Sequence, residues 1–271
     1  MRRLAPGLSL TLVLLCVNAT IAGPISEYYI TAGDQRMIHV IQGSSVSRSW
    51  SGTGLYEYPV AVLNGTVRTS AYSAGGTGAE YTAAGVATGT TYAYPGTIRG
   101  FFDSTTDGSY NYGYDYSAGG MYRMDLDWQN PTLLFGGPTG NLAVTYDRTN
   151  NSLWVANWWG STIANLDMSG NPLSSFSTGI SEMTGLALDP ADGTLWFGTQ
   201  NDLWSTRTLY QYSKAGAALS IEAYAALSNQ NYLGGEFNFV SAVPEPTTLA
   251  IWSALGGLGM MVAARRRRRV A

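Results

Sequence analysis

The chain has almost none of the residues on which thiol, imidazole and most metal chemistry depend. Its 271 residues include one cysteine, Cys16, and one histidine, His39. One cysteine excludes a disulfide within the chain, and zinc sites and Ser-His-Asp triads both draw on histidine. His39 lies in the alternating stretch Met37–Ile41, where a lone histidine is most often structural. We therefore expect no catalytic residue and no metal ligand in this protein.

The cysteine lies in a segment with the features of a secretory signal peptide. Arg2-Arg3 gives a positive start, Leu8–Val17 is an apolar run, and small residues follow, with Ala22 or Ala19 as the cleavage point. The residue before Cys16 is not small, which argues against a lipoprotein. We predict that residues 1–22 are removed on export, which leaves a mature protein without cysteine.

The other end of the chain carries a second targeting pattern in three parts. The parts are a motif of Val243, Pro244, Glu245 and Pro246, an uncharged stretch Thr247–Ala264, and a cluster of Arg265, Arg266, Arg267, Arg268 and Arg269. The prolines disfavour helix before and through themselves, so a helix is expected only after them. A helix over the uncharged stretch would be about 27 Å long, close to the hydrocarbon thickness of a bilayer. The arginines are costly to translocate, which predicts a cytoplasmic end.

The order of these parts resembles the PEP-CTERM sorting signal of Gram-negative bacteria, over residues 243–271. The resemblance implies that an exosortase, a membrane protease-transpeptidase, recognises the Pro-Glu-Pro region of an exported precursor and removes the helix. It also implies an exported protein that the helix anchors transiently in the inner membrane. The destination would be the cell envelope or the extracellular matrix. The alternative is a plain anchor that is never cleaved.

The region between the two targeting segments is acidic. Without Arg2-Arg3, the tail arginines and Glu245, residues 24–243 keep 8 Lys and Arg against 17 Asp and Glu, a net charge of −9. Nucleic-acid binding calls for a basic surface, so we expect no nucleic-acid partner. Lys214 is the single lysine of the chain.

An internal repeat gives the strongest indication of fold. Val144–Trp154 and Leu186–Trp196 align without a gap at a spacing of 42 residues. Each reads as a strand, a turn that begins at Asp147 or Asp189, and a second strand opening on Leu-Trp. Further strand signals follow at Ile163–Asp167, Leu173–Phe176, Leu209–Tyr212 and Leu219–Ile221. Each copy is therefore predicted to hold four strands.

Weaker copies lie upstream. Their strand and turn signals are Tyr28–Ala32, Met37–Ile41, Val60–Leu63, Val67–Tyr72, Asp107–Tyr110, Met121–Asp125 and Thr132–Phe135. A last strand is predicted at Glu236–Val240. Residues 73–97 fit either a long loop or a degenerate copy.

Four-stranded units at this period resemble the blades of a β-propeller, and the phrase Gly185–Trp196 is similar to the NHL, YVTN and SMP-30-like group. The resemblance implies an all-β domain over residues 23–242, with about five four-stranded blades. Because the chain starts in mid-blade, Glu236–Val240 is expected to supply the inner strand of the first blade and close the ring. The alternative is an open β-sandwich.

Paired carboxylates are the main candidates for chemistry. They are Asp125 with Asp127, Asp103 with Asp107, and Asp189 with Asp192. Such pairs can bind calcium or act as acid and base, but these lie where turns and strand edges are expected. We expect them to cap the backbone and expect no cofactor, with calcium as the alternative.

Trp158 and Trp159 are the candidate ligand-binding residues. If their segment is extended, adjacent side chains point to opposite faces, so one ring is exposed and can stack on a sugar ring. Exopolysaccharide is the matching partner. The predicted function is a non-enzymatic binding or structural propeller. The alternative is a metal-dependent propeller hydrolase, lactonase or lyase acting on extracellular carbohydrate or lactone, which would gather carboxylates at one mouth of its channel.

Overall fold

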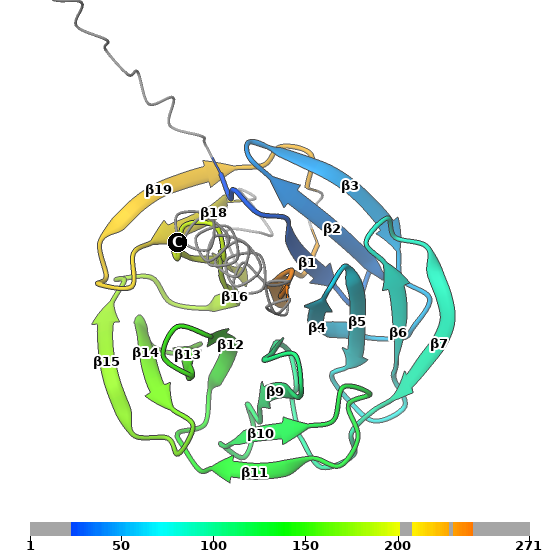
Figure 1. Ribbon diagram of the computed structural model, residues 1–271, viewed down its shortest axis with the longest axis horizontal. Helices are drawn as coiled ribbons and strands as arrows, with labels where there is room; N and C mark the ends of the chain where they lie inside the picture. The colour runs from blue at the N-terminus through cyan, green and yellow to red at the C-terminus, as the bar shows by residue number, and fades with distance from the viewer. Residues whose placement is uncertain (1–22, 201–207, 228–229, 241–271) are drawn as a thin grey trace, which may run out of the picture.

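The protein forms five four-stranded antiparallel sheets arranged as blades around one axis (Figure 1). The computed structural model describes residues 23–200, 208–227 and 230–240. The predicted all-β propeller with five blades is confirmed. The predicted signal peptide (1–22) and sorting tail (243–271) lie outside the described residues. Within the described residues, no helix has both the length and the apolar character that a membrane span requires.

Each blade consists of four strands in order from the axis to the rim. Blade 1 contains β20 (Gly234–Phe237), β1 (Tyr28–Ala32), β2 (Met37–Gln42) and β3 (Ser45–Ser51). Blade 2 contains β4 (Glu57–Leu63), β5 (Thr66–Ala71), β6 (Thr77–Thr82) and β7 (Ala87–Ala93). Blade 3 contains β8 (Ser104–Thr106), β9 (Asn111–Tyr114), β10 (Met121–Met124) and β11 (Thr132–Phe135). Blade 4 contains β12 (Asn141–Asp147), β13 (Ser152–Asn157), β14 (Thr162–Asp167) and β15 (Pro172–Ser177). Blade 5 contains β16 (Met183–Leu188), β17 (Leu195–Thr199), β18 (Thr208–Tyr212) and β19 (Ala218–Ala223).

The last strand closes the ring, as predicted, but it begins earlier than the sequence suggests. β20 pairs with β1 in antiparallel register, from Thr31 opposite Gly234 to Tyr28 opposite Phe237. A Cβ on Gly234 would lie 1.8 Å from the carbonyl oxygen of Tyr58. The strand therefore starts at glycine because the backbone of blade 2 approaches too closely for a side chain.

The repeated turns take the predicted form. Asp147 Oδ1 accepts a hydrogen bond of 3.0 Å from the N–H of Thr149, two residues on, and Asp189 does the same at the equivalent turn. Each turn contains a residue with positive φ, as hairpin turns often require: Asn151 at 53° and Gly193 at 71°. Sequence period and turn chemistry thus agree over blades 4 and 5.

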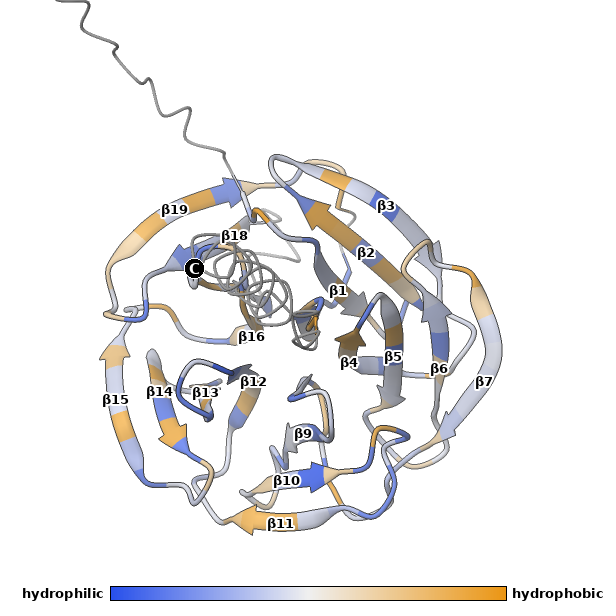
Figure 2. Ribbon diagram, in the orientation of Figure 1, coloured by the Kyte–Doolittle hydropathy of each residue, from blue (hydrophilic) through white to orange (hydrophobic). Residues whose placement is uncertain are grey.

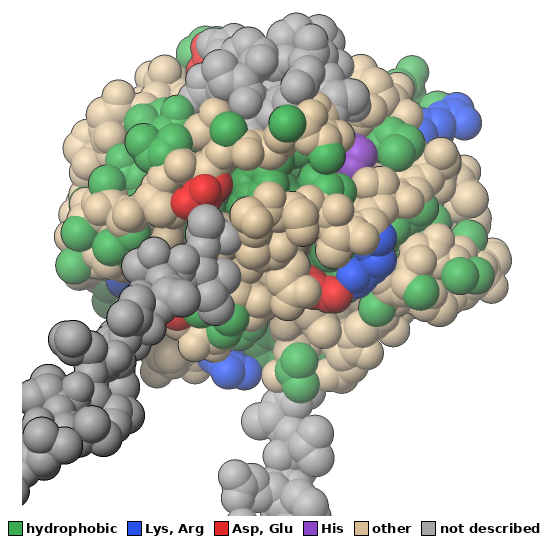
Figure 3. Space-filling model, turned by 90° about the horizontal axis from the view of Figure 1, so that it is seen from above, with side chains coloured by type: hydrophobic (Ala, Val, Ile, Leu, Met, Phe, Trp, Pro, Cys, Tyr) green, Lys and Arg blue, Asp and Glu red, His purple; other side chains and the backbone are tan. Residues whose placement is uncertain are grey.

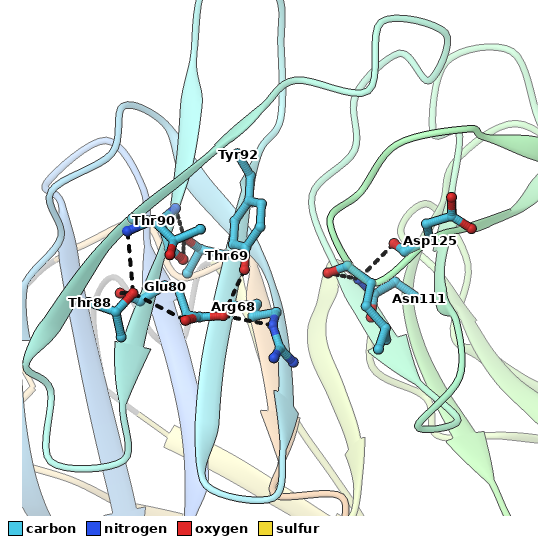
Figure 4. A network of polar contacts seen from close by, with 10 residues as sticks. Arg68, Thr69, Glu80, Thr88, Thr90, Tyr92, Asn111 and Asp125 are labelled. Atoms are coloured by element: carbon cyan, nitrogen blue, oxygen red, sulfur yellow. Dashed lines mark hydrogen bonds and ion pairs between the residues drawn. The ribbon is translucent and has the colours of Figure 1, made fainter.

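Residues 73–97 are neither a long loop nor a separate degenerate blade. They supply β6 and β7, the outer half of blade 2. Glu80 joins these strands to β5, since its Oε2 lies 3.0 Å from Arg68 Nε and accepts a hydrogen bond of 2.8 Å from Tyr92 OH (Figure 4). β7 is mostly exposed and carries no apolar alternation, which explains its weak signal in the sequence.

Apolar side chains pack mainly between neighbouring blades. Trp154 and Trp196, at equivalent positions of the repeat, are both buried there. The outer strands β15 and β19 contain both apolar and polar residues, most of them exposed (Figure 2). Charged side chains are few and scattered over the face of the rim that Figure 3 shows.

Candidate functional site: the mouth of the propeller

The ring has two different faces because its innermost strands, β20, β4, β8, β12 and β16, run in the same direction. We call the face where these strands begin the mouth face and the face where they end the tail face. On the tail face, the N–H groups of Ile25 and Ser26 donate to Asp189, and Arg148 Nη1 lies 3.5 Å from the carbonyl oxygen of Val240. The described propeller therefore begins and ends on the tail face.

A buried aspartate joins three blades at the axis. Asp103, just before β8, accepts hydrogen bonds of 3.0 Å from the N–H of Val144 in β12 and 2.9 Å from that of Gly235 in β20. The sequence predicts that Asp103 caps nearby backbone. It does bind backbone, but in two other blades, because the ring brings their inner strands to the same point. This carboxylate is fully buried and is part of the framework.

Glu236 is a second carboxylate at the axis. Its Oε1 accepts a hydrogen bond of 2.8 Å from the N–H of Phe237, whereas Oε2 has no hydrogen-bond partner among the described residues. Burial raises the pKa of both Asp103 and Glu236 well above the usual range. N–H donors meet both oxygens of Asp103 but only one oxygen of Glu236.

A cavity of about 320 Å³ opens on the mouth face. It is lined by Phe102, Tyr116, Leu142, Trp158, Trp159, Gln200, Asn231 and Leu233. These are aromatic, aliphatic and amide side chains, and none of the eight carries a formal charge at neutral pH. Gln200 Nε2 donates a hydrogen bond of 2.8 Å to Asn231 Oδ1, which fixes an amide pair in the cavity wall. Such a surface can stack on a ligand and exchange hydrogen bonds with it.

A ladder of backbone hydrogen bonds holds the loops of this cavity. Gly140 N–H donates to Tyr116 at 2.9 Å, Trp158 to Gly140 at 2.7 Å, Glu182 to Trp158 at 2.7 Å and Gln200 to Glu182 at 3.0 Å. The ladder follows the 42-residue period of the sequence: Tyr116, Trp158 and Gln200 are equivalent, as are Gly140 and Glu182. Each of blades 3, 4 and 5 therefore contributes the loop after its second strand to the mouth.

Aromatic rings form a continuous row from the cavity toward blade 2. The ring centroids lie 6.5 Å apart for Trp159 and Tyr116, 5.7 Å for Tyr116 and Phe102, 5.1 Å for Phe102 and Tyr72, and 5.5 Å for Tyr72 and Tyr56. We call these five residues the aromatic row. Its two ends are the exposed members, with 72% of Trp159 and 37% of Tyr56 accessible to solvent.

The two sequence-predicted tryptophans lie together at this mouth. They fall in the bend between β13 and β14, not in an extended strand. Trp158 is half-buried and packs on the core between blades 4 and 5, while Trp159 is exposed. The sequence reasoning missed Phe102, Tyr116 and the amide pair. The 42-residue spacing of Tyr116 and Gln200 from Trp158 was the signal that could have found two of them.

The other candidate residues from the sequence lie elsewhere. His39 is buried in blade 1, with Nδ1 2.6 Å from Ser49 Oγ and Nε2 3.1 Å from Tyr232 OH. Asp107 and Asp127 accept hydrogen bonds from backbone N–H groups of their own turns. Within the described residues, no group of three or more His, Cys, Asp or Glu side chains is placed to hold a metal ion.

Comparisons with known proteins agree with both parts of this chain. A family model for the PEP-CTERM protein-sorting motif matches residues 242–269. No curated protein matches the sequence. A chain from a nidogen/laminin complex aligns with a TM-score of 0.55 and 11% identity, covering 79% of this chain and 98% of that one. Glutaminyl cyclase from Myxococcus xanthus aligns with a TM-score of 0.50 and 13% identity, covering 64% and 72%.

A streptogramin B lyase also aligns, with a TM-score of 0.46 and 14% identity over 76% of this chain and 67% of that one. At such low identities the likeness concerns the fold alone. The sorting motif, in contrast, is matched in the sequence itself. The chain is therefore an exported protein in which a five-bladed β-propeller precedes a PEP-CTERM sorting motif.

Proposed function

We propose that this protein is a non-enzymatic carbohydrate-binding propeller of the cell envelope or extracellular matrix, which binds a polysaccharide at the mouth of its ring. The observation that carries the proposal is Trp159, whose ring is 72% exposed at the edge of a cavity with uncharged lining. An exposed tryptophan at the edge of a cavity can stack on a ligand that enters the cavity. The flat apolar face of a sugar ring suits such a ring, and its hydroxyl groups suit the neighbouring amides.

The position of the tail supports a role in display. The propeller ends on the tail face, and the sorting motif follows directly, so an anchored or processed tail would hold the mouth face away from the attachment point. An exosortase that cleaves near Pro244–Pro246 would then leave the mouth open toward the surroundings. We expect the inner membrane to be a partner only before this processing.

Among the described residues, the lining of the mouth-face cavity favours binding over catalysis. Hydrolases and lyases need a positioned acid or base near the substrate. The cavity wall offers aromatic rings and amides, and the axial carboxylate of Asp103 is fully buried and engaged with backbone N–H groups.

A polysaccharide-binding assay with two matched variants tests the proposal. The full chain is applied to an array of bacterial and plant polysaccharides, as wild type, as Trp159→Ala and as Tyr110→Ala. Tyr110 is an exposed tyrosine in the turn after β8, on the tail face, and serves as control. Trp159→Ala is expected to lower affinity about tenfold, whereas Tyr110→Ala leaves it unchanged. Equal binding by all three chains would contradict the proposed site.

A further inference from the structure

The residue just before the inner strand has the same unusual backbone in three blades. Tyr56 precedes β4, Gly140 precedes β12 and Glu182 precedes β16, with φ of 64°, 82° and 58°. In each blade this residue's carbonyl accepts a hydrogen bond from the residue after the second strand. The left-handed conformation is therefore a requirement of the mouth loop in these blades, and glycine meets it with the least strain.

Blade 4 shows why glycine is used there. A Cβ on Gly140 would lie 2.4 Å from Cδ1 of Trp159, so the tryptophan ring occupies the space that a side chain would take. In blade 4 the residue with positive φ is a glycine and the neighbouring loop supplies the aromatic ring, whereas in blade 2 the residue with positive φ, Tyr56, carries the ring itself. Tyr56 is bulky, and its ring lies at one of the two exposed ends of the aromatic row.

The loop thus requires a left-handed backbone at position 56, but it does not require a tyrosine side chain there. Bulky residues are rare outliers at positive φ and persist where surrounding structure or function holds them. The Tyr56 ring contacts Tyr72, whose ring stacks on Phe102 at an interplanar angle of 21°. The strain places one more accessible ring in line with those of the mouth cavity.

We propose that Tyr56 is the distal end of an extended binding site for a neutral polysaccharide chain, which lies along the aromatic row from Trp159 across blades 4, 3 and 2. This inference rests on the proposed function, and it adds the length, direction and charge class of the ligand. The aromatic row has an exposed ring at each end and half-buried rings between them, so it can contact several sugar units in line; we call this extended site the track. A site for a single sugar would need only the cavity.

The charge class follows from the surroundings of the track. The eight residues that line the cavity carry no formal charge, and the five rings of the row are uncharged at neutral pH. The chain between the targeting segments has a net charge of −9, which repels an acidic polymer at low ionic strength. Neutral chains meet no such barrier.

Binding as a function of ligand length tests the track. Affinities of the full chain for neutral glucan oligosaccharides, from disaccharide to hexasaccharide, are measured by calorimetry, with an alginate oligosaccharide as the acidic comparison. The variants are Trp159→Ala, Tyr56→Gly and Tyr56→Phe, with Tyr110→Ala as control. Glycine at position 56 removes the ring and relieves the backbone, so the Tm should stay the same or rise.

The expected pattern is specific to a track. Wild-type affinity rises with glucan length by about tenfold from disaccharide to hexasaccharide, and alginate binds more weakly. Tyr56→Gly should remove the gain in affinity with length and keep the affinity for the disaccharide. Tyr56→Phe should retain the gain. Trp159→Ala should lower the affinity for both the disaccharide and the hexasaccharide.

Three results would overturn the inference while leaving the mouth as a binding site. They are hexasaccharide binding by Tyr56→Gly at wild-type affinity, a clearly lowered Tm of that variant, and tighter binding of alginate than of glucan. If no saccharide binds wild type at all, the proposed function fails together with the track.

Discussion

Asp103 Oδ1 accepts a hydrogen bond of 2.9 Å from the N–H of Gly235, a residue 132 positions further along the chain. The bond connects the entry of the third blade to the strand that closes the first. Oδ2 of the same carboxylate binds the N–H of Val144 in the fourth blade. One buried side chain therefore links three of the five blades at the axis.

Substitution of Asp103 by asparagine should destabilise the ring strongly. Asparagine keeps one acceptor oxygen and replaces the other with an NH2 group. That NH2 group would face either the N–H of Val144 or the N–H of Gly235, and this backbone N–H would lose its acceptor in a buried site. The expected loss in the free energy of unfolding is about 3 kcal/mol, measured by urea denaturation. Asp127→Asn, in an exposed turn, is the matched control and should change stability by about 0.5 kcal/mol or less. Similar effects of the two substitutions would contradict the role given to Asp103.

Glu236→Gln should have the opposite effect at neutral pH. The folded-state pKa of Glu236 lies above the ordinary 4.5 because of burial, so the folded state binds a proton more tightly than the unfolded state. The stability from this group is complete below pH 4.5 and is lost as pH rises through the folded-state pKa, at up to about 1.4 kcal/mol per pH unit. Glutamine cannot ionise, so the variant should unfold at a higher Tm at pH 7 and with a flatter pH dependence. Parallel pH profiles for the two proteins would show that Glu236 does not titrate in this way.

Closure of the ring should depend on Gly234. An alanine Cβ there would lie 1.8 Å from the carbonyl oxygen of Tyr58 and 2.6 Å from Thr31 Oγ1, so the backbone of blade 1 or blade 2 must move. Gly234→Ala is expected to cost about 3 kcal/mol by thermal or chemical denaturation. Gly136→Ala is the control, since a Cβ at this exposed glycine has no neighbour within 4 Å. If Gly234→Ala and Gly136→Ala both unfold at the same Tm and denaturant midpoint as wild type, the close approach of Tyr58 does not limit the residue at position 234.

The sorting motif predicts processing of the tail. Intact-mass measurement of the protein from the envelope or medium of a producing cell with an exosortase should show a chain that ends near Pro244–Pro246 and lacks the arginine cluster. Replacement of Pro244, Glu245 and Pro246 by alanine should leave the full tail on the protein. Persistence of the tail in wild-type protein would indicate an uncleaved anchor.

Much of the fold can be predicted from local patterns. These patterns are the 42-residue period, the aspartate turns and the Leu-Trp strand openings. Each depends on contacts within one blade, between residues that are close in the sequence. The closing strand is also predictable, because the chain begins with what reads as a second strand. β7 is not, since an exposed outer strand needs no apolar alternation and leaves little trace in the sequence. β6 is partly buried, but its sequence also lacks a clear apolar alternation.

The site is only half visible in the sequence. Trp158 and Trp159 stand out by composition alone. Tyr56, Tyr72 and Phe102 join them only after the ring has closed, because each comes from a different loop and the sequence does not show which loops share a face. The axial role of Asp103 is hidden for the same reason, as its partners lie in blades that are distant along the chain.

Hydrogen–deuterium exchange of the full chain, with and without a neutral polysaccharide at saturating concentration, tests the central claim most directly. Ligand bound at the mouth should slow exchange in the segments around Tyr116, Gly140–Asn141 and Asn157–Gly160, whose backbone N–H groups form and flank the mouth ladder. The tail-face turns at Asp147–Asn151 and Asp189–Gly193 should exchange at the same rate in both samples. Protection confined to the tail face or to the outer strands would contradict a carbohydrate site at the mouth.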